Sequence, residues 1–452
     1  MANFLETVNG FVWGAPALLL ILGVGMYLTV KLKFAQFILL PRAIKALFSP
    51  NSRSSGGVSA YQALCTALAA TVGTGNLVGV AGAICLGGPG AIFWMWVCGF
   101  LGMATKYAEA TLAVQYRVKD GDAYLGGPMY VMVNGLGKRF YPMAAAYCLC
   151  GMLAAFGVGT GAQINAVITG LHGVQARFGL YSTKTGDMLI GIAMGIGLCT
   201  LLLGGAASVG KAAEKLIPFA ACGYLALCIG VLIVRHERIG EVFWMIFQGA
   251  ATPRAVTGGM LGSTFTALRI GCSRGVFTNE AGMGTAAMAH GSAKVSHPSQ
   301  QGLMGILEVF LDTIVICTMT ALVILVSGVP IPYGQDVGAE LTVASFSSIY
   351  GPNAVIWLTA AMLLFTVATV LGWGFYGARC AEFLFGKQAW KWFAVVQAGA
   401  AAASAVLDTS TVWQLSETLN GLMAIPNLIT LAVLTPKVCS LTEAFRKPEQ
   451  RK

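Results

Sequence analysis

The chain has 452 residues, of which 56% are hydrophobic and 10% charged, and its mean hydropathy is +0.74. Soluble domains are about 45–50% apolar and about 25% charged, so this composition excludes an ordinary soluble enzyme or binding domain and indicates a polytopic membrane protein. The net charge of +10 lies in short clusters between apolar stretches. We interpret these clusters as signals that orient membrane helices, and we expect no nucleic-acid partner.

Apolar stretches long enough to span a bilayer recur along nearly the whole chain. We expect an all-α protein with eleven transmembrane helices, centred in chain order on residues 12–32, 58–86, 89–116, 139–171, 187–207, 212–234, 240–268, 302–328, 353–378, 390–408 and 412–436. The expected parts are an extra N-terminal helix with a basic loop (1–57), a five-helix repeat (58–235), a second five-helix repeat (236–436) and a basic tail (437–452). The sequence indicates no cofactor and no obligatory protein partner.

The basic loops predict the orientation of the helices. Under the positive-inside rule the N-terminus lies outside and the C-terminus in the cytoplasm, with one disagreeing cluster at Arg235, His236 and Arg238. Because five helices are an odd number, the two repeats have opposite orientations. Such inverted repeats are typical of secondary transporters, whose sites lie near the midplane on broken helices at corresponding positions of the two halves.

The first helix of the first repeat is interrupted by Gly73-Thr74-Gly75-Asn76. Glycines weaken a helix, and freed backbone groups must be buried in protein or line a cavity. Freed carbonyls can coordinate a cation, and the N-terminus of the following half-helix can hold a carboxylate. The alternative is that these glycines only allow close helix packing, but an asparagine at mid-bilayer favours a site.

We expect the matching break of the second repeat in "FQGAATPRAVTGG", residues 247–259, which contains Gly249 and Pro253. The alternative is a loop at Pro253 and Arg254 that separates two shorter segments. The stretch "RGVFTNEAGMGTAAMAH", residues 274–290, is expected to be a cytoplasmic loop that belongs to an inner gate or forms a capped amphipathic helix.

Charged residues within the apolar segments are candidates for function. Glu308 and Asp312 share one helix face, and each is either a gating or ion-coupling residue or a structural anchor. Lys106 and Glu109 are expected to neutralise each other at a helix end. The histidines, His290 among them, are expected in loops and exposed to solvent.

Several long motifs resemble those of the alanine or glycine:cation symporter family, in the same order along nearly the entire chain. They are "TVGTGNLVGVAGAICLGGPGAIFWMWVCGFLGMATKYAEA", "SRGVFTNEAGMGTAAMAH", "GILEVFLDTIVICTMTALVILVSG", "VLGWGFYGARC" and "NGLMAIPNLI". The resemblance implies a bacterial or archaeal inner-membrane carrier of small neutral amino acids. It also implies sodium coupling, alternating access and a LeuT-type five-plus-five fold preceded by one extra helix.

The resemblance also implies the site. The substrate would contact Thr74, Gly75, Asn76, Gln163, Thr369 and Trp373, with Asn165 as the alternative to Gln163 and Gly249 added by the expected second break. The sodium ion, which is a transported ligand and not a cofactor, would be held by Ala69, Val72, Phe365 and Thr369.

Ala368 departs from the family, which commonly has serine there, and this removes one oxygen of the kind that sodium prefers. Proton coupling, or another small amino acid as substrate, therefore remains an alternative. An ion channel is a further alternative function, because broken helices also line the pores of channels. The sequence has no phosphate-binding loop of an ATP-driven pump and no histidine cluster typical of a membrane enzyme.

Overall fold

The computed structural model describes residues 14–49, 57–253, 257, 263–335, 339–407 and 410–446. In chain order its helices and strands are α2 (Ala15–Lys31), α3 (Ala35–Leu47), α4 (Ala60–Thr71), η2 (Gly75–Gly79), α5 (Val80–Gly87), α6 (Gly90–Gln115), β1 (Val118–Asp120), β2 (Ala123–Leu125), α7 (Pro128–Val131), η3 (Met132–Leu136), η4 (Lys138–Phe140), α8 (Tyr141–Phe156), η5 (Gly157–Gly161), α9 (Ala162–Arg177), α10 (Lys184–Leu203), α11 (Gly205–Val234), η6 (His236–Arg238), α12 (Ile239–Ala251), α14 (Thr264–Asn279), α15 (Thr285–Gly291), α16 (Pro298–Val309), η7 (Phe310–Cys317), α17 (Thr318–Ser327), α18 (Glu340–Tyr350), α19 (Ala354–Phe385), α20 (Ala389–Ser404) and α21 (Ser410–Arg446).

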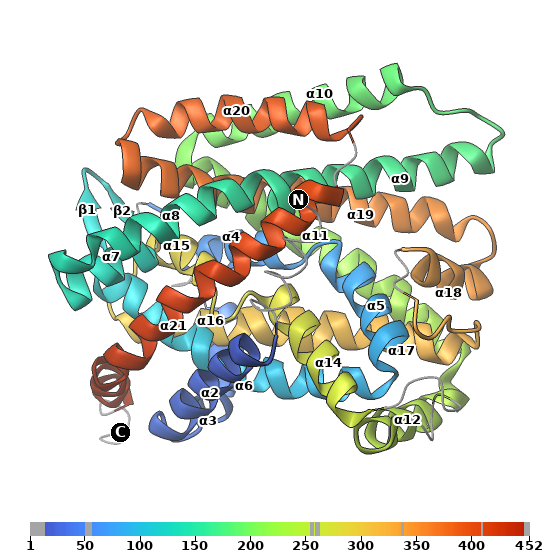
Figure 1. Cartoon of the computed structure of the whole chain (residues 1–452), viewed down its shortest axis with the longest axis horizontal. Helices are drawn as coiled ribbons and strands as arrows, with labels where there is room; N and C mark the ends of the chain where they lie inside the picture. Colours follow the sequence, from blue (N-terminus) through green and yellow to red (C-terminus); the bar gives the residue numbers. More distant parts are fainter. Residues whose placement is uncertain are drawn as a thin grey trace.

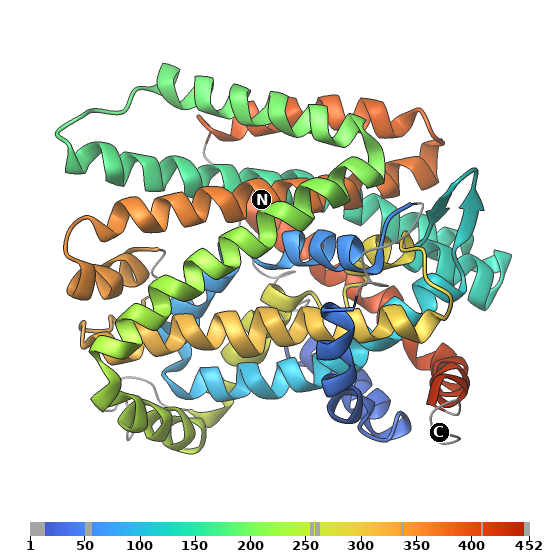
Figure 2. The same cartoon turned by 180° about the vertical axis from the view of Figure 1, so that it is seen from behind.

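Long helices form the body of the molecule and run mainly along its longest axis (Figure 1). Helices α10 and α20 pack together at one edge, and α6 packs with α14 and α16 at the opposite edge. Helices α4, α5 and α19 lie between them, as the view from behind also shows (Figure 2). The hairpin β1–β2 pairs Val118 with Leu125 and projects at one end of the bundle.

Local sequence explains where several helices begin and end. Ser59 and Gln62 form a capping box that starts α4. Helix α16 starts with Pro298 at its first position, behind His297 as N-cap. Gly328 follows α17 with φ 77°, a left-handed conformation that glycine adopts without strain.

The break predicted within residues 73–76 is confirmed. Helix α4 ends at Thr71 and η2 begins at Gly75, and the two halves of this broken span are bent by 54°. Val72 between them is extended, with φ −78° and ψ 99°. The helix therefore opens at mid-length, where backbone groups become available for a ligand.

The second break lies elsewhere than expected. Residues 240–268 are not one helix, because α12 ends at Ala251 and α14 begins at Thr264. Arg254 and Gly258–Gly259 of the predicted motif lie outside the described residues. The alternative of two shorter segments separated near Pro253 agrees with the ends of α12 and α14. A second interruption, called the second break below, separates α14 from α15 at residues 280–284, within the stretch expected to be a cytoplasmic loop. Two glycines within it, Gly282 (φ 96°) and Gly284 (φ 79°), explain why the helix stops there.

Three π-helical turns flank the first break: η2, which continues it, η5 in the middle of the α8–α9 span, and η7 between α16 and α17. Such wide turns are rare and occur frequently at functional sites. Asn76 lies in η2, Asp312 lies in η7, and η5 directly precedes the helix that carries Gln163. These three positions surround the candidate site.

By length and hydropathy, six described helices can cross a membrane, and two bent helix pairs raise this number to eight. One bent pair is α2 with α3, which meet at 80°. Residues 35–47, expected to be part of a loop, therefore form a helix. The total of eleven spans stays a prediction.

Candidate functional site

The first break leaves backbone donors without backbone partners. The Gly73 N–H donates to Oδ1 of Asn76 at 2.8 Å. In the described part of the chain, the N–H groups of Thr74 and Gly75 donate to no backbone carbonyl. Two unpaired N–H groups at the start of a half-helix can hold a carboxylate, because the helix dipole adds to their hydrogen bonds.

Asn76 connects the first break to the second half of the chain. Its Nδ2 donates to Oδ1 of Asp312 at 2.7 Å, and Oδ2 of Asp312 accepts from the Thr313 hydroxyl at 2.9 Å. Asn76 and Asp312 are fully buried. A buried polar network of this kind holds its members in one geometry, so Asp312 helps to position Asn76.

Gln163 lies beside the break, as the resemblance implies. The Thr74 hydroxyl donates to its Oε1 at 2.9 Å. Asn165, the alternative, instead lines a cavity of about 790 Å³ that also reaches Thr74 and Gly75. Residues of η2, α9, α14, α18 and α19 line this cavity, which gives the candidate site a path to one side of the molecule.

Three of the four expected sodium ligands come together. The Thr369 hydroxyl donates to the Phe365 carbonyl at 2.9 Å and lies 3.5 Å from the Val72 carbonyl. Ala69, one helical turn before Val72, is fully buried. Gly73 lies so close that a Cβ placed on it would be 2.6 Å from the Thr369 hydroxyl. Hard oxygen atoms of this kind suit a small cation.

Trp373 is 1% exposed and stands one helical turn beyond Thr369 on α19. Gly159 of η5 packs against it so closely that a Cβ on Gly159 would collide with the Cβ of Trp373. The Trp373 side chain is therefore fixed against the π-helical turn η5.

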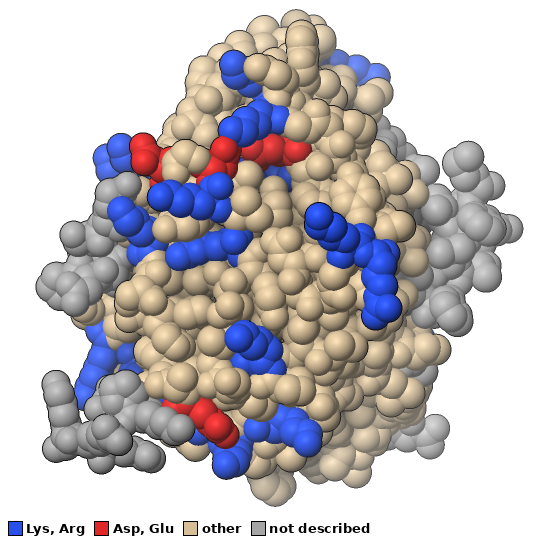
Figure 3. Space-filling model, turned by 90° about the vertical axis from the view of Figure 1, so that its left-hand side faces the viewer, with Lys and Arg blue, Asp and Glu red and all other residues tan. Residues whose placement is uncertain are grey.

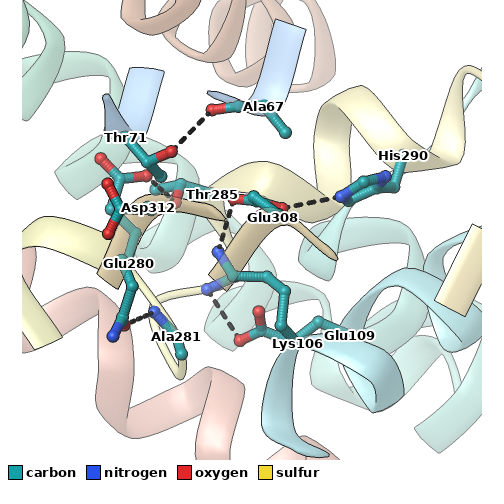
Figure 4. Close-up of polar contacts among 12 residues, drawn as sticks. Ala67, Thr71, Lys106, Glu109, Glu280, Ala281, Thr285, His290, Glu308 and Asp312 are labelled. Atoms are coloured by element: carbon teal, nitrogen blue, oxygen red, sulfur yellow. Dashed lines mark hydrogen bonds and ion pairs between the residues drawn. The ribbon is translucent and has the colours of Figure 1, made fainter. Parts of the chain in front are cut away.

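Lys106 does not neutralise Glu109 in the predicted way. Its Nζ lies 3.2 Å from Oε1 of Glu308, and both side chains are fully buried. His290 is also fully buried rather than exposed: it contacts Oε2 of Glu308 at 2.8 Å and the Gln301 amide at 2.7 Å. Glu308 thus belongs to a fully buried ionic network (Figure 4).

Glu109 has a different role, since it holds the second break. Its Oε1 accepts from the N–H groups of Gly282 and Gly284, at 3.0 and 3.1 Å, and from the Asn427 amide at 2.7 Å. Freed donors of the break are thereby satisfied without water, as a membrane interior requires.

Gly249 is not brought together with the first break. It lies in α12, where its backbone packs so closely on Gly90 that a Cβ on either residue would lie 2.9 Å or less from the backbone of the other. Its structural use is close helix packing.

Sequence reasoning assigned Glu280 and His290 to a cytoplasmic loop and missed that both are buried. The glycines at 282 and 284 were the signal that could have found this region, since two closely spaced glycines also mark the first break.

Known proteins resemble this chain along its whole length. The family model described as "Sodium:alanine symporter family" matches residues 1–452. The chain belongs to this family. A sodium/alanine symporter of Methanococcus maripaludis is 42% identical over 98% of this chain and 97% of its own length. A probable sodium/glutamine symporter of Bacillus subtilis is 35% identical over 100% of this chain and 92% of its own length.

The fold of this sodium:alanine symporter family member is of the LeuT type. The crystal structure of MhsT in complex with L-phenylalanine matches with a TM-score of 0.57 and 13% identity, over 85% of this chain and 97% of that one. At this identity the likeness concerns the fold alone, and it agrees with the two broken helices described above.

Proposed function

We propose that the protein carries a small neutral amino acid, alanine or glycine, into the cell together with sodium by alternating access. The observation that supports this best is that the Thr369 hydroxyl of α19, which donates to the Phe365 carbonyl of its own helix, lies 3.5 Å from the Val72 carbonyl at the end of α4. A cation that replaces the contact between α4 and α19 would bind both helices at once, so ion binding would favour one conformation of the carrier.

The substrate is proposed to place its carboxylate at the N–H groups of Thr74 and Gly75. Asn76 and Gln163 would position this turn, and Trp373 would limit the size of the side chain. A fixed, buried indole suits a methyl group or a hydrogen better than a large side chain.

Proton coupling is the second candidate, supported by the departure at Ala368 and by the buried carboxylate of Asp312 next to Asn76. A relative in Bacillus subtilis, 31% identical, bears the name putative sodium/proton-dependent alanine carrier protein. Glu308 would be the other coupling candidate, although its pairing with Lys106 favours a structural role.

The protein is proposed to lie in the plasma membrane with its N-terminus outside and its C-terminus in the cytoplasm. Lys and Arg predominate over Asp and Glu on the face that holds the hairpin and the C-terminal end of α21 (Figure 3). The exception at residues 235–238 has a local explanation, since Arg238 donates to the Val326 carbonyl at the end of α17.

Uptake of radiolabelled alanine into proteoliposomes tests the proposal. Uptake is compared under three conditions: an inward sodium gradient, an inward proton gradient, and no gradient. We expect uptake above equilibrium only with sodium. Uptake driven by protons alone would favour the second candidate, and passage that never saturates or exceeds equilibrium would favour a channel.

A further inference from the structure

A cavity of about 490 Å³ lies at the end of the molecule that carries the β1–β2 hairpin (Figure 1). The hairpin, the α10–α11 junction, the stretch after α15 and the α19–α20 junction line it. On this face Lys and Arg side chains lie next to Asp and Glu side chains (Figure 3), and the charged residues of the lining are Lys294, Arg379, Lys387, Lys391, Asp120, Asp122 and Glu382. The described lining includes none of the residues assigned above to the substrate or to sodium, so the proposed transport does not explain this cavity.

Arg379 is the most buried cation of this lining, with 5% of its surface exposed. Its guanidinium lies 4.9 Å from the centre of the Trp390 ring and 5.3 Å from that of Phe375. The Trp390 ring is itself fixed, because its Nε1 donates to the Leu202 carbonyl at 2.7 Å. Nη1 of Arg379 donates to Oε2 of Glu382 at 2.6 Å, but Nε has no hydrogen-bond partner among the described residues. A buried guanidinium that two rings hold in place and that is only partly paired is a planar donor for a phosphate or a carboxylate.

The charges left unpaired in the lining favour an anion. Two ion pairs, that of Lys387 with Asp120 at 2.6 Å and that of the guanidinium just described, are each neutral. Lys294, Lys391 and Asp122 form no ion pair with any residue that the structure describes. Two cations and one carboxylate are therefore left, so the cavity can compensate one further negative charge.

Large apolar side chains are exposed beside the same cavity. Leu203, which lines the cavity at the end of α10, is 48% exposed. Phe385, two residues before Lys387, is 69% exposed, and Trp392, directly after Lys391, is 72% exposed. Basic side chains next to aromatic ones are typical of the interface between membrane and water. A ligand with one negative charge and hydrocarbon chains would contact both kinds of residue, whereas a free anion would contact only the basic ones.

We propose that this cavity binds the headgroup of an anionic phospholipid, such as phosphatidylglycerol, from the leaflet on the hairpin side. Arg379 holds the phosphate, Lys294 and Lys391 add positive charge, and the acyl chains lie along the exposed apolar side chains just named. The backbone N–H of Lys294 donates to the Val58 carbonyl at 2.8 Å, shortly before α4. A bound lipid therefore contacts the stretch that leads into the first broken helix. The inference goes beyond the proposed transport, because it concerns a bound lipid and not the carried solute.

The test measures the binding of single lipids to the purified, delipidated full-length protein by native mass spectrometry. Phosphatidylglycerol, phosphatidylethanolamine and phosphatidylcholine with the same acyl chains are titrated separately, and the apparent Kd of the first bound lipid is determined. The variants are Lys294→Gln, Lys391→Gln and Arg379→Gln. Lys184→Gln is the matched control, because Lys184 is an exposed lysine at the other end of α10 from Leu203.

We expect the wild-type protein to bind phosphatidylglycerol about tenfold or more tightly than either of the other lipids. Lys294→Gln and Lys391→Gln should each weaken that binding about fivefold, the loss typical of one basic residue near an anionic lipid surface. Arg379→Gln should weaken it about tenfold or more, because a charge-assisted hydrogen bond is lost, and Lys184→Gln should leave it unchanged. Equal affinity for the three lipids, or an equal loss in Lys184→Gln, would overturn the proposal.

Two competitors identify the source of the bound group. Inorganic phosphate and alanine, each in millimolar excess, should not displace phosphatidylglycerol, and displacement by either would assign the cavity to a free solute and contradict a lipid site.

Arg379→Gln also leaves Glu382 without its partner. If this variant does not fold, the double variant Lys294→Gln with Lys391→Gln decides, and its loss of affinity should be about the product of the two single losses. The titrations need neither an ion gradient nor an amino acid, so a failure of this proposal is distinguishable from a failure of the proposed function.

Discussion

Asn76 and Asp312 are separated by 236 residues, yet Nδ2 of Asn76 donates to Oδ1 of Asp312 at 2.7 Å in the buried centre of the molecule. The same Asn76 side chain accepts the Gly73 N–H. One amide therefore shapes the first broken helix and ties it to η7, on the other half of the chain.

Replacing Asn76 should impair transport by protein that still inserts. Asn76→Ala leaves the Gly73 N–H and the Asp312 carboxylate without this partner, which costs about 1–3 kcal/mol for each unpaired group. We expect kcat/KM for alanine uptake to fall about tenfold to a hundredfold as the turn loses its shape. Asn134→Ala, at an exposed position, is the control. Unchanged uptake by well-inserted Asn76→Ala protein would contradict the assignment of this site.

Substitutions at Thr369 and Ala368 should change the apparent affinity for sodium in opposite directions. Thr369→Ala removes the hydroxyl near the Val72 and Phe365 carbonyls, so the sodium concentration for half-maximal uptake should rise about tenfold, as expected for one lost ligand to a cation. Ala368→Ser adds a hydroxyl and should lower that concentration. Both are measured from initial uptake rates across a sodium series. Thr359→Ala, on the same helix, should leave the sodium dependence unchanged, and a shift there equal to that of Thr369→Ala would move the ion site elsewhere.

Trp373 should set the upper size of the substrate. Because its indole is buried against Gly159, Trp373→Ala opens space in the pocket and should weaken alanine uptake while it allows a larger amino acid such as glutamine to compete. Competition assays with a size series of neutral amino acids measure this change. Trp244→Ala removes an indole that is 68% exposed and should not alter the order of preference.

The Lys106–Glu308 pair should contribute to stability and not to sodium affinity. Glu308→Gln leaves a buried ammonium with less compensation, and breaking such a pair costs about 3–5 kcal/mol. We expect a lower melting temperature in detergent. The double variant Lys106→Met with Glu308→Gln should recover part of the loss, because neither member of this pair then carries a charge. If the double variant loses more stability than the two single variants lose together, the Lys106–Glu308 pair is not the main interaction of these residues.

The first break could be predicted from sequence because its signal is local. Two glycines and Asn76 within a long apolar run weaken the helix at one point, and family resemblance placed Gln163 and Thr369 near that point. The partner of Asn76 could not be predicted, because a hydrogen bond across 236 residues depends on tertiary packing.

The second break was misplaced for a physical reason. Pro253 and the glycines near it gave a stronger local signal than residues 280–284, whose charged Glu280 and following His290 suggested a solvated loop. The second break and His290 are buried because their polar groups are paired with Glu109 of α6 and Glu308 of α16. Single-sequence patterns cannot reveal such pairing, and they gave no sign of the π-helical turns η5 and η7.

Helix α21 has 37 residues, which at 1.5 Å per residue corresponds to about 55 Å, whereas the hydrocarbon core of a bilayer is about 30 Å thick. Much of this helix therefore stands in the headgroup region or beyond it, even allowing for bends at Pro426 and Pro436. Asn427, one residue beyond the first of these prolines, holds Glu109 and the second break. Because Asn427 joins α21 to the second break, we expect turnover in reconstituted vesicles to depend on the acyl-chain length of the lipid.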